Sequence, residues 1–160
     1  MKKLLLSTIV MVCGFVCGLS AQEAPAAKPL RYKVGDLYQD DDKVGVIFLV
    51  DVTGRHGKIL SLVDAPNTMT WEEAMTYCSA GTWYLPSKDE LIQIFRNKEA
   101  VNEGLVKVEG SPLVESWYWT SEEYGKGNKT KKSWFVSMED SNFYYLDWTE
   151  PIYVRAVSAF

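Results

Sequence analysis

Three aromatic-rich segments in the second half of the chain constrain its fold more than any other feature. In chain order they are GTWYLPSKDEL at residues 81–91, WYWTSE at residues 117–122 and YVRAV at residues 153–157. Each segment places large apolar side chains next to signals that begin a helix or a strand. Because such side chains are usually buried in a folded protein, we expect most of them to lie in the core. The segments therefore specify a scaffold and carry little information about a reaction.

Hydrophobic patterning ahead of these segments predicts β-strands at residues 32–38, 43–52 and 58–63. The middle stretch is apolar on both faces, as is typical of a central strand. The sequence TGRHG at residues 53–57 is a strong turn signal, which predicts a β-hairpin with the next stretch. We expect this region, residues 31–63, to form an N-terminal hairpin that leads into the rest of the domain.

Two helices are predicted to follow, each with its own start signal. Thr70 with Glu73, and Ser87 with Glu90, both fit the capping box, in which each side chain bonds the backbone N–H of the other residue. Residues 97–104 are expected to add a turn of helix. The predicted buried stripes are Trp71, Ala74, Met75 and Cys78 in the first helix, and Leu91, Ile94 and Phe95 in the second.

The remainder of the chain returns to β-structure. Strands are predicted at residues 116–121, 133–138, 143–146 and 152–158. The order of strands, helices and strands predicts an α+β fold in which two helices pack on an antiparallel sheet. Residues 31–160 contain no internal repeat and no second linker, so we interpret them as one domain.

The first residues have the pattern of a secretory signal peptide at residues 1–21. Lys2 and Lys3 precede an almost wholly apolar stretch at residues 4–19, and small residues follow up to Ala21. A retained membrane anchor and a lipidated N-terminus remain open alternatives. The Ala- and Pro-rich residues 22–30 are expected to form a linker. These features predict export to the periplasm, the cell surface or the extracellular space, with membrane contact only through a retained anchor.

Cysteine content and charge exclude several classes of protein. Removal of the signal peptide leaves Cys78 as the one cysteine, so no intramolecular disulfide can form and Cys78 is expected to be a small buried side chain. The formal charge of the chain is −4. An acidic chain lacks the positive surface that nucleic-acid binding requires, so no nucleic-acid partner is expected. No cofactor is predicted either.

The order of the segments resembles one bacterial family. The pattern is a helix, then Gly-aromatic-x-Leu-Pro-Thr/Ser-x-x-Glu-Leu, then a Trp-x-Ser/Thr-Ser-x-Glu strand, a Trp-x-Val strand and a closing Tyr-Val-Arg-x-Val strand. This order resembles the C-type-lectin-like domain at the C-terminus of the Legionella collagen-like adhesin and of secreted bacterial paralogues. The resemblance covers residues 70–157 and implies a C-type-lectin-like fold. The matching residues are Trp83, Leu85, Pro86, Ser87, Glu90, Leu91, Trp119, Ser121, Glu122, Trp134, Val136, Tyr153, Val154, Arg155 and Val157.

The chain departs from this family in ways that bear on function. The usual Gly-Trp-Arg-Leu-Pro is one residue longer here and lacks the arginine. Ile152 follows Glu150-Pro151 where a calcium-binding lectin would have asparagine, so no metal site is expected. The paired cysteines of the formylglycine-generating relatives are also missing. The resemblance thus implies the scaffold without the better-known chemistries, and Arg155 is expected to pair with a carboxylate.

Catalytic chemistry has little support in the sequence. Hydrolases of the serine or cysteine type need a base beside the nucleophile, and the single histidine, His56, lies in the predicted hairpin turn. Glycosidases use two carboxylates, and acidic pairs occur at residues 72–73, 122–123 and 139–140. Of these only Glu122 lies in a motif, where pairing with a basic side chain is an equally good interpretation. We therefore expect no enzyme, with a glycan-acting enzyme as the more distant alternative.

The late segment SNFYYLDW at residues 141–148 most resembles a binding site. Alternation is expected to bury Phe143 and Tyr145 on one face of a strand and to present Tyr144 on the other. Aromatic side chains beside amides and carboxylates suit sugar stacking or a protein contact. The lysine-rich loop at residues 124–132 would border this surface. The predicted ligand-binding residues are Tyr124, Asn142, Tyr144, Asp147 and Trp148.

These observations predict an exported, non-catalytic binding module for a glycan or a protein at a bacterial envelope. The alternative is a structural component of a surface layer or fimbria-like polymer, in which the domain packs against partners. The long strand that is apolar on both faces and the apolar residues 156–160 favour this alternative.

Overall fold

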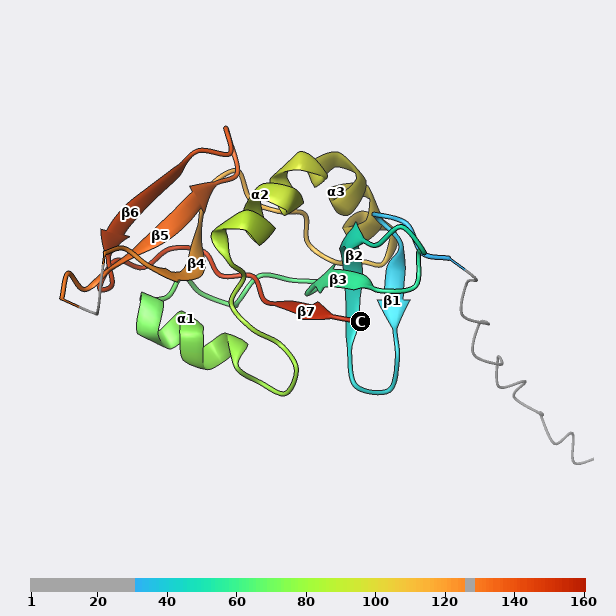
Figure 1. Cartoon of the computed structure of the whole chain (residues 1–160), viewed down its shortest axis with the longest axis horizontal. Coiled ribbons are helices and arrows are strands. Elements are labelled where there is room, and N and C mark those ends of the chain that lie inside the picture. The colour runs from blue at the N-terminus through green and yellow to red at the C-terminus, as the bar shows by residue number, and fades with distance from the viewer. Residues whose placement is uncertain (1–30, 126–128) are drawn as a thin grey trace, which may run out of the picture.

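The structure, a computed structural model, describes residues 31–125 and 129–160. The expected signal peptide at residues 1–21, the expected linker at residues 22–30, and residues 126–128 of the lysine-rich loop lie outside the described residues. The described part is α+β, as predicted, with two antiparallel sheets (Figure 1). Its elements are β1 (Leu37–Gln39), β2 (Val44–Val50), β3 (Gly57–Leu60), α1 (Trp71–Cys78), α2 (Lys88–Arg96), α3 (Lys98–Lys107), β4 (Trp117–Glu123), β5 (Lys132–Ser137), β6 (Phe143–Asp147) and β7 (Val157–Ala159).

The first sheet has the strand order β1-β2-β3-β7. Strand β2 is central and largely buried, as its two apolar faces predict, and it forms the expected hairpin with β3. Strand β7 lies on the other side of β3, where Val157 is opposite Leu60. The last strand therefore completes the sheet that the N-terminal hairpin begins.

The predicted strand at residues 152–158 is wrong in its first half. Ile152 forms an isolated bridge with Met69, and Tyr153 forms one with Tyr118. The segment crosses between the two sheets and pairs with single residues on its way, so only Val157–Ala159 continue as a strand.

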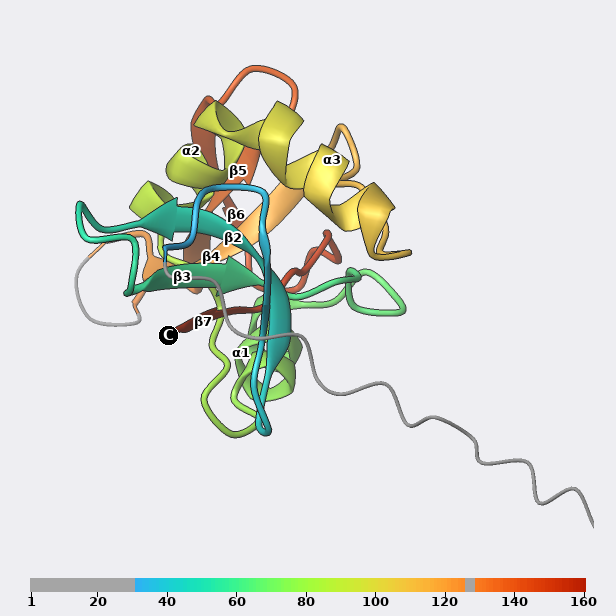
Figure 2. The same ribbon diagram turned by 90° about the vertical axis from the view of Figure 1, so that its right-hand side faces the viewer.

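The second sheet has the order β4-β5-β6 and lies between helices. Helix α2 packs on one side of β4 and β5 and also contacts β2, whereas α1 contacts β4 from the other side (Figures 1 and 2). Helix α3 packs on β2. Strand β6 is the outer strand of this sheet, at the end of the molecule far from β1 (Figure 1).

Both capping boxes predicted from the sequence are present. The hydroxyl of Thr70 accepts the N–H of Glu73, whose carboxylate accepts the N–H of Thr70, and Ser87 and Glu90 do the same for α2. These pairs satisfy backbone donors that the first turn of a helix leaves without partners. Of the helix positions predicted to be buried, Met75 is exposed, at 38%, because α1 buries a narrower face.

The expectation of two helices is wrong, because α3 is a full third helix. Residues 97–104 were expected to add a turn of helix, and α3 is longer, over Lys98–Lys107. Its buried side chains, Val101 and Leu105, are four residues apart and so lie on one face. Gly104 lets this helix approach the backbone of Gly35, which a side chain at residue 104 would block. The glycine that weakens the helical pattern in the sequence is the residue that allows the packing.

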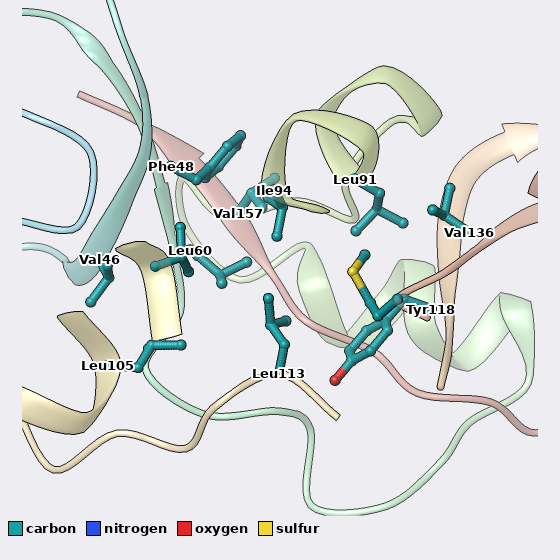
Figure 3. Packing of buried hydrophobic residues seen from close by; sticks show 12 residues of the cluster. Val46, Phe48, Leu60, Leu91, Ile94, Leu105, Leu113, Tyr118, Val136 and Val157 are labelled. Atoms are coloured by element: carbon teal, nitrogen blue, oxygen red, sulfur yellow. The ribbon is translucent and has the colours of Figure 1, made fainter. Parts of the chain in front are cut away.

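Two groups of buried side chains form the core. In the first, Leu91 and Ile94 of α2 gather with Leu60, Tyr118 and Val157 from three strands (Figure 3). Burial of one such aliphatic side chain stabilises a fold by about 1.5–3 kcal/mol, so this contact fixes α2 on both sheets. The second group joins α1 to the second sheet through Trp71, Ala74, Cys78, Leu85, Trp119, Phe135, Trp148, Ile152, Val154 and Ala156.

Arg155 is buried and pairs with a carboxylate, in agreement with its expected structural role. Its Nε donates to Asp64, and its other two nitrogens donate to the carbonyls of Ser61 and Ser111. The hydroxyl of Tyr118 donates to the second carboxylate oxygen of Asp64. Burial and the neighbouring Asp64 charge raise the pKa of Tyr118, so it remains a donor. This network joins three loops to β4.

Glu90 at the start of α2 is a buried acceptor for three donors. It accepts hydrogen bonds from Lys58 Nζ at 2.6 Å, from the Tyr84 hydroxyl at 2.7 Å and from the Ser87 N–H at 2.7 Å. Burial acts to raise the pKa of Glu90, but these hydrogen bonds together outweigh burial and lower it below its ordinary value of 4.5. The hydrogen bond to Glu90 likewise raises the pKa of Lys58.

Glu90→Gln is expected to weaken the acid dependence of stability. A carboxyl whose pKa is lower in the folded state contributes stability above its unfolded pKa and loses it as pH falls through the folded pKa. Below about pH 4.5 the stability of the wild type should therefore fall more steeply than that of the variant. At pH 7 the free energy of unfolding of the variant should be lower than that of the wild type by about 1–3 kcal/mol. Urea unfolding at several pH values measures both slopes. The control is Glu103→Gln, whose exposed pair with Lys107 spans 3.9 Å; equal slopes for wild type and Glu90→Gln would contradict the prediction.

Candidate functional site

The β4-β5-β6 sheet carries the segments that the sequence marks for binding. Trp134 lies opposite Tyr145, and Phe135 lies opposite Tyr144, in the pairing of β5 with β6. Because successive side chains of a strand point to opposite faces, Tyr144 and Tyr145 lie on different faces of the sheet. The face of Tyr145 is the one that α2 partly covers, and the face of Tyr144 is the one that α1 partly covers.

Four aromatic rings collect on the α2 side of the sheet, in the part that α2 does not cover, and we call them the aromatic face: Tyr124, Trp134, Phe143 and Tyr145. Tyr124 and Tyr145 are stacked with ring centroids 3.9 Å apart. Trp134 lies edge-on to Tyr124, Phe143 and Tyr145 at 5.0, 5.6 and 5.9 Å. Phe143 and Tyr145 remain 46% and 44% exposed. Rings from β5, β6 and the residue after β4 thus form a preformed apolar platform at the surface.

Two lysines give the aromatic face a positive charge. Lys88 Nζ lies 4.8 Å from the ring centroid of Trp134 and 4.5 Å from that of Phe143, and no carboxylate of the described residues forms an ion pair with it. Lys132 Nζ lies over Tyr145 and 3.8 Å from Asp147. A cation over an aromatic ring is favourable by about 0.5–2 kcal/mol. Lys88 is therefore held in place by rings while its charge remains available to an anion.

Glu122 fixes the position of Lys88. Its carboxylate Oε1 accepts the backbone N–H of Lys88 at 2.8 Å. The partner is therefore a backbone amide at the start of α2, and not the basic side chain considered from the sequence. This contact joins β4 to the start of the helix, which places the Lys88 side chain above Trp134.

The opposite face of the sheet has a shallow groove of about 430 Å³. Its apolar wall is formed by Trp117, Phe135 and Tyr144, of which Trp117 and Tyr144 are 47% and 50% exposed. Glu139 and Asp140 give its end a negative charge. The two faces beside β6 are therefore both aromatic, but they differ in the sign of their charge.

The structure separates the five predicted ligand-binding residues. Tyr124 and Asp147 lie on the side of the aromatic face, whereas Tyr144 lies on the opposite face. Asn142 is exposed in the turn before β6, where its side chain bonds Asp140. The expectation that Phe143 and Tyr145 are buried is wrong, because α2 ends its cover before it reaches β6 and leaves both rings exposed.

Trp148 belongs to the core and is not available to a ligand as predicted. It is 6% exposed, and its ring stacks on Trp71 with centroids 4.5 Å apart. Its indole N–H donates to the Ser133 hydroxyl at 2.7 Å. The chain turns inward after Asp147, so the ring enters the space between α1 and the sheet.

Four members of this surface were not predicted from the sequence to bind a ligand: Trp134, Phe143, Tyr145 and Lys88. Phe143 and Tyr145 were expected to be buried by alternation, and neither Trp134 nor Lys88 was among the predicted ligand-binding residues. One signal was present: residues 143–145 are aromatic at three successive positions, so one aromatic face had to remain outside any single core.

A larger surface hollow lies elsewhere, beside α1. It has a volume of about 650 Å³ and is lined by Asn67, Thr68, Met69, Glu72, Glu73, Thr76 and Tyr77. Glu73 is occupied by the capping box, and Glu72 lies 3.8 Å from Lys131. The two carboxylates of this hollow therefore already have partners within the protein.

Other polar groups considered for chemistry have structural partners or lie apart. His56 is exposed between β2 and β3. Cys78 is buried, and burial raises the pKa of its thiol to about 12, as expected for a core side chain. Across residues 31–125 and 129–160, no group of three or more His, Cys, Asp and Glu side chains is placed to hold a metal ion.

Comparison with models of known protein families gives no match, and no curated protein is significantly similar to the chain. In the part of the chain that the structure describes, no helix has both the length and the apolar character needed to cross a membrane.

Proposed function

We propose that this protein is an exported, non-catalytic binding module with a C-type-lectin-like fold, and that the aromatic face binds a glycan. The observation that carries the proposal is the collection of four rings, from β5, β6 and the residue after β4, with Lys88 held over two of them. An apolar platform with few polar groups is the usual composition of a ligand site.

The fold proposal rests on the resemblance together with the observed architecture. The first two aromatic segments begin α2 and form β4, as their residues predict, and the third leads into β7. The family also uses the late part of the domain as its variable binding surface, and the aromatic face lies there. Both points support the proposal.

The chemistry of the aromatic face favours a glycan with an acidic group. The apolar faces of sugar rings can stack on aromatic rings, and the Lys88 ammonium lies at the edge of the platform. An ammonium without a carboxylate partner favours a carboxylate or sulfate on the ligand. The shallow platform suits a chain of sugars better than a small enclosed molecule.

A second candidate function is assembly with other proteins, and the open outer edge of β6 favours it. Exposed aromatic residues on both faces of one outer strand are unusual for a surface that binds sugars on one face only. An exposed strand edge can pair with another polypeptide.

Tyr145→Ala is expected to weaken glycan binding at least tenfold, which corresponds to about 1.4 kcal/mol. The variant removes an exposed ring from the aromatic face and opens the stack with Tyr124. The matched control is Tyr77→Ala, which removes a ring of similar exposure, 46%, from the hollow beside α1. A glycan array identifies the ligand, and titration calorimetry of both variants gives the affinities.

Lys88→Gln then tests the charge. Binding of an acidic glycan should fall and lose part of its salt dependence, while binding of a neutral analogue should change little. Loss of binding with Tyr77→Ala and not with Tyr145→Ala would move the site to α1. No binding across glycans of either charge would overturn the glycan proposal.

A further inference from the structure

Strand β6 has the longest uncovered edge among the described strands. The outer side of β4 is covered by residue Tyr153, which exchanges hydrogen bonds with Trp117 and Trp119. The outer side of β7 is covered by Tyr84, which pairs with Val157. Strand β1 is also an outer strand but has three residues, whereas β6 has five and no described residue pairs with its outer side.

The backbone groups at this edge can be assigned from the pairing of β5 with β6. Ser137 N–H donates to the carbonyl of Asn142, and Trp148 N–H donates to that of Lys131. In an antiparallel pair, alternate residues point their N–H and C=O groups toward the partner strand. The even-numbered residues 142–148 therefore bond β5, and Phe143, Tyr145 and Asp147 point these groups outward.

The outward groups include donors and acceptors with no partner on their side. No hydrogen bond among the described residues uses the outward N–H and C=O groups of Phe143 and Tyr145, whereas the outward carbonyl of Asp147 accepts the N–H of Glu150. Natural sheets usually protect such an edge with Lys, Pro, a bulge or a covering segment. Residues 143–147 contain no Lys or Pro, and their pairing with β5 runs without a bulge.

Side chains on both faces would flank an added strand. Phe143 and Tyr145 extend from the aromatic face, and Tyr144 extends from the opposite face at 50% exposure. A sugar bound to one face leaves Tyr144 unexplained. A polypeptide strand beside β6 would contact all three rings and the outward backbone groups together.

We propose that β6 pairs antiparallel with β6 of a second copy of this protein. The centre of the five-residue strand is Tyr145, so a two-fold axis there pairs all five residues. It places Tyr145 opposite Tyr145 of the second copy, Tyr144 opposite its Leu146, and Phe143 opposite its Asp147. The same patch is then used by both copies, and the contact closes at a dimer.

The charges near the strand permit this pairing. Asp147 is the one charged residue of β6, and Lys132 lies 3.8 Å from it. The two copies of Asp147 would be four residues apart along the pair, about 14 Å, which exceeds the screening length at physiological salt. An aromatic ring, and no like charge, stands directly opposite each carboxylate. The strand is thus complementary to itself, which selects a second copy as the occupant.

Sedimentation velocity over a range of protein concentrations tests the pairing. The protein is purified in the form that the expression host produces. We expect a concentration-dependent dimer for the wild type. Tyr145→Pro removes an outward N–H, which β5 does not use, and it removes the ring. Tyr145→Ala removes the ring alone. The dimer dissociation constant should rise at least tenfold more for the proline variant than for the alanine variant.

Backbone amide exchange followed by NMR provides a second test that needs no substitution. The amides of Phe143, Tyr145 and Asp147 should gain protection as concentration rises, while those of Tyr144 and Leu146 should be protected at every concentration. The proposal would be overturned if the protein were monomeric at all concentrations or if the two variants raised the dimer dissociation constant equally. It would also be overturned if the protection of the outward amides did not change with concentration. Alanine and proline at residue 145 remove the same ring, so both variants should lose glycan binding equally. Only the proline variant also removes the outward N–H, so the two variants should lose the dimer unequally. These two readouts separate this proposal from the glycan proposal.

Discussion

Arg155→Met is expected to lower the free energy of unfolding by about 3–5 kcal/mol, the cost of removing one partner from a buried ion pair. The guanidinium of Arg155 is 1% exposed and supplies donors to Asp64, Ser61 and Ser111. Methionine fills a similar volume but donates nothing. The Asp64 carboxylate would then keep only the Tyr118 hydroxyl as a side-chain donor, and two carbonyls would lose theirs.

Urea unfolding of the variant measures this loss. The matched control is Arg96→Met, because Arg96 is exposed and its replacement should change stability by less than about 0.5 kcal/mol. Combining Arg155→Met with Asp64→Asn should cost less than the sum of the two single changes, since the double variant has no unpaired buried charge. Additive losses, or a loss from Arg155→Met no larger than that of the control, would show that the network does not stabilise the fold.

Trp148→Ala is expected to cost about 3–5 kcal/mol, as is usual for removing a buried aromatic ring. The ring fills the space between α1 and the sheet, stacks on Trp71 and donates to Ser133. Alanine would leave a cavity and an unpaired hydroxyl. The variant should therefore unfold at lower urea concentration, and any loss of ligand binding should follow the loss of folded protein.

The comparison that isolates burial is Trp117→Ala, which removes a ring that is 47% exposed. This change should cost well under half as much as Trp148→Ala. If Trp148→Ala instead kept full stability and abolished binding, then Trp148 would be a ligand contact, as the sequence first suggested.

Features that depend on neighbours in the sequence could be predicted. Both capping boxes join residues three apart, and the hairpin of β2 and β3 joins strands across one short turn. The α+β class followed from the order of these local signals. Helix α3 was missed because Gly104 lowers helix propensity, and its benefit depends on the distant backbone of Gly35.

The candidate site could be predicted as a segment but not as a surface. Residues 143–145 are apolar on both faces, so alternation sorts their side chains without saying which face a helix covers. Which face is covered depends on where α2 crosses the sheet. Trp134 and Trp148 look alike in sequence, and the structure places the first at the surface and the second in the core.

The position of β7 beside β3 also affects when the fold can form. Arg155 and Ser61 are 94 residues apart in the chain, and both Val157 and Arg155 are needed to complete buried contacts with the hairpin region. Contacts of such long range form late and slow folding. A nascent chain cannot close its core before β7 has been synthesised, so it stays incompletely folded until then. For a chain that we propose is exported, delayed closure keeps the polypeptide in the state that a translocation channel accepts.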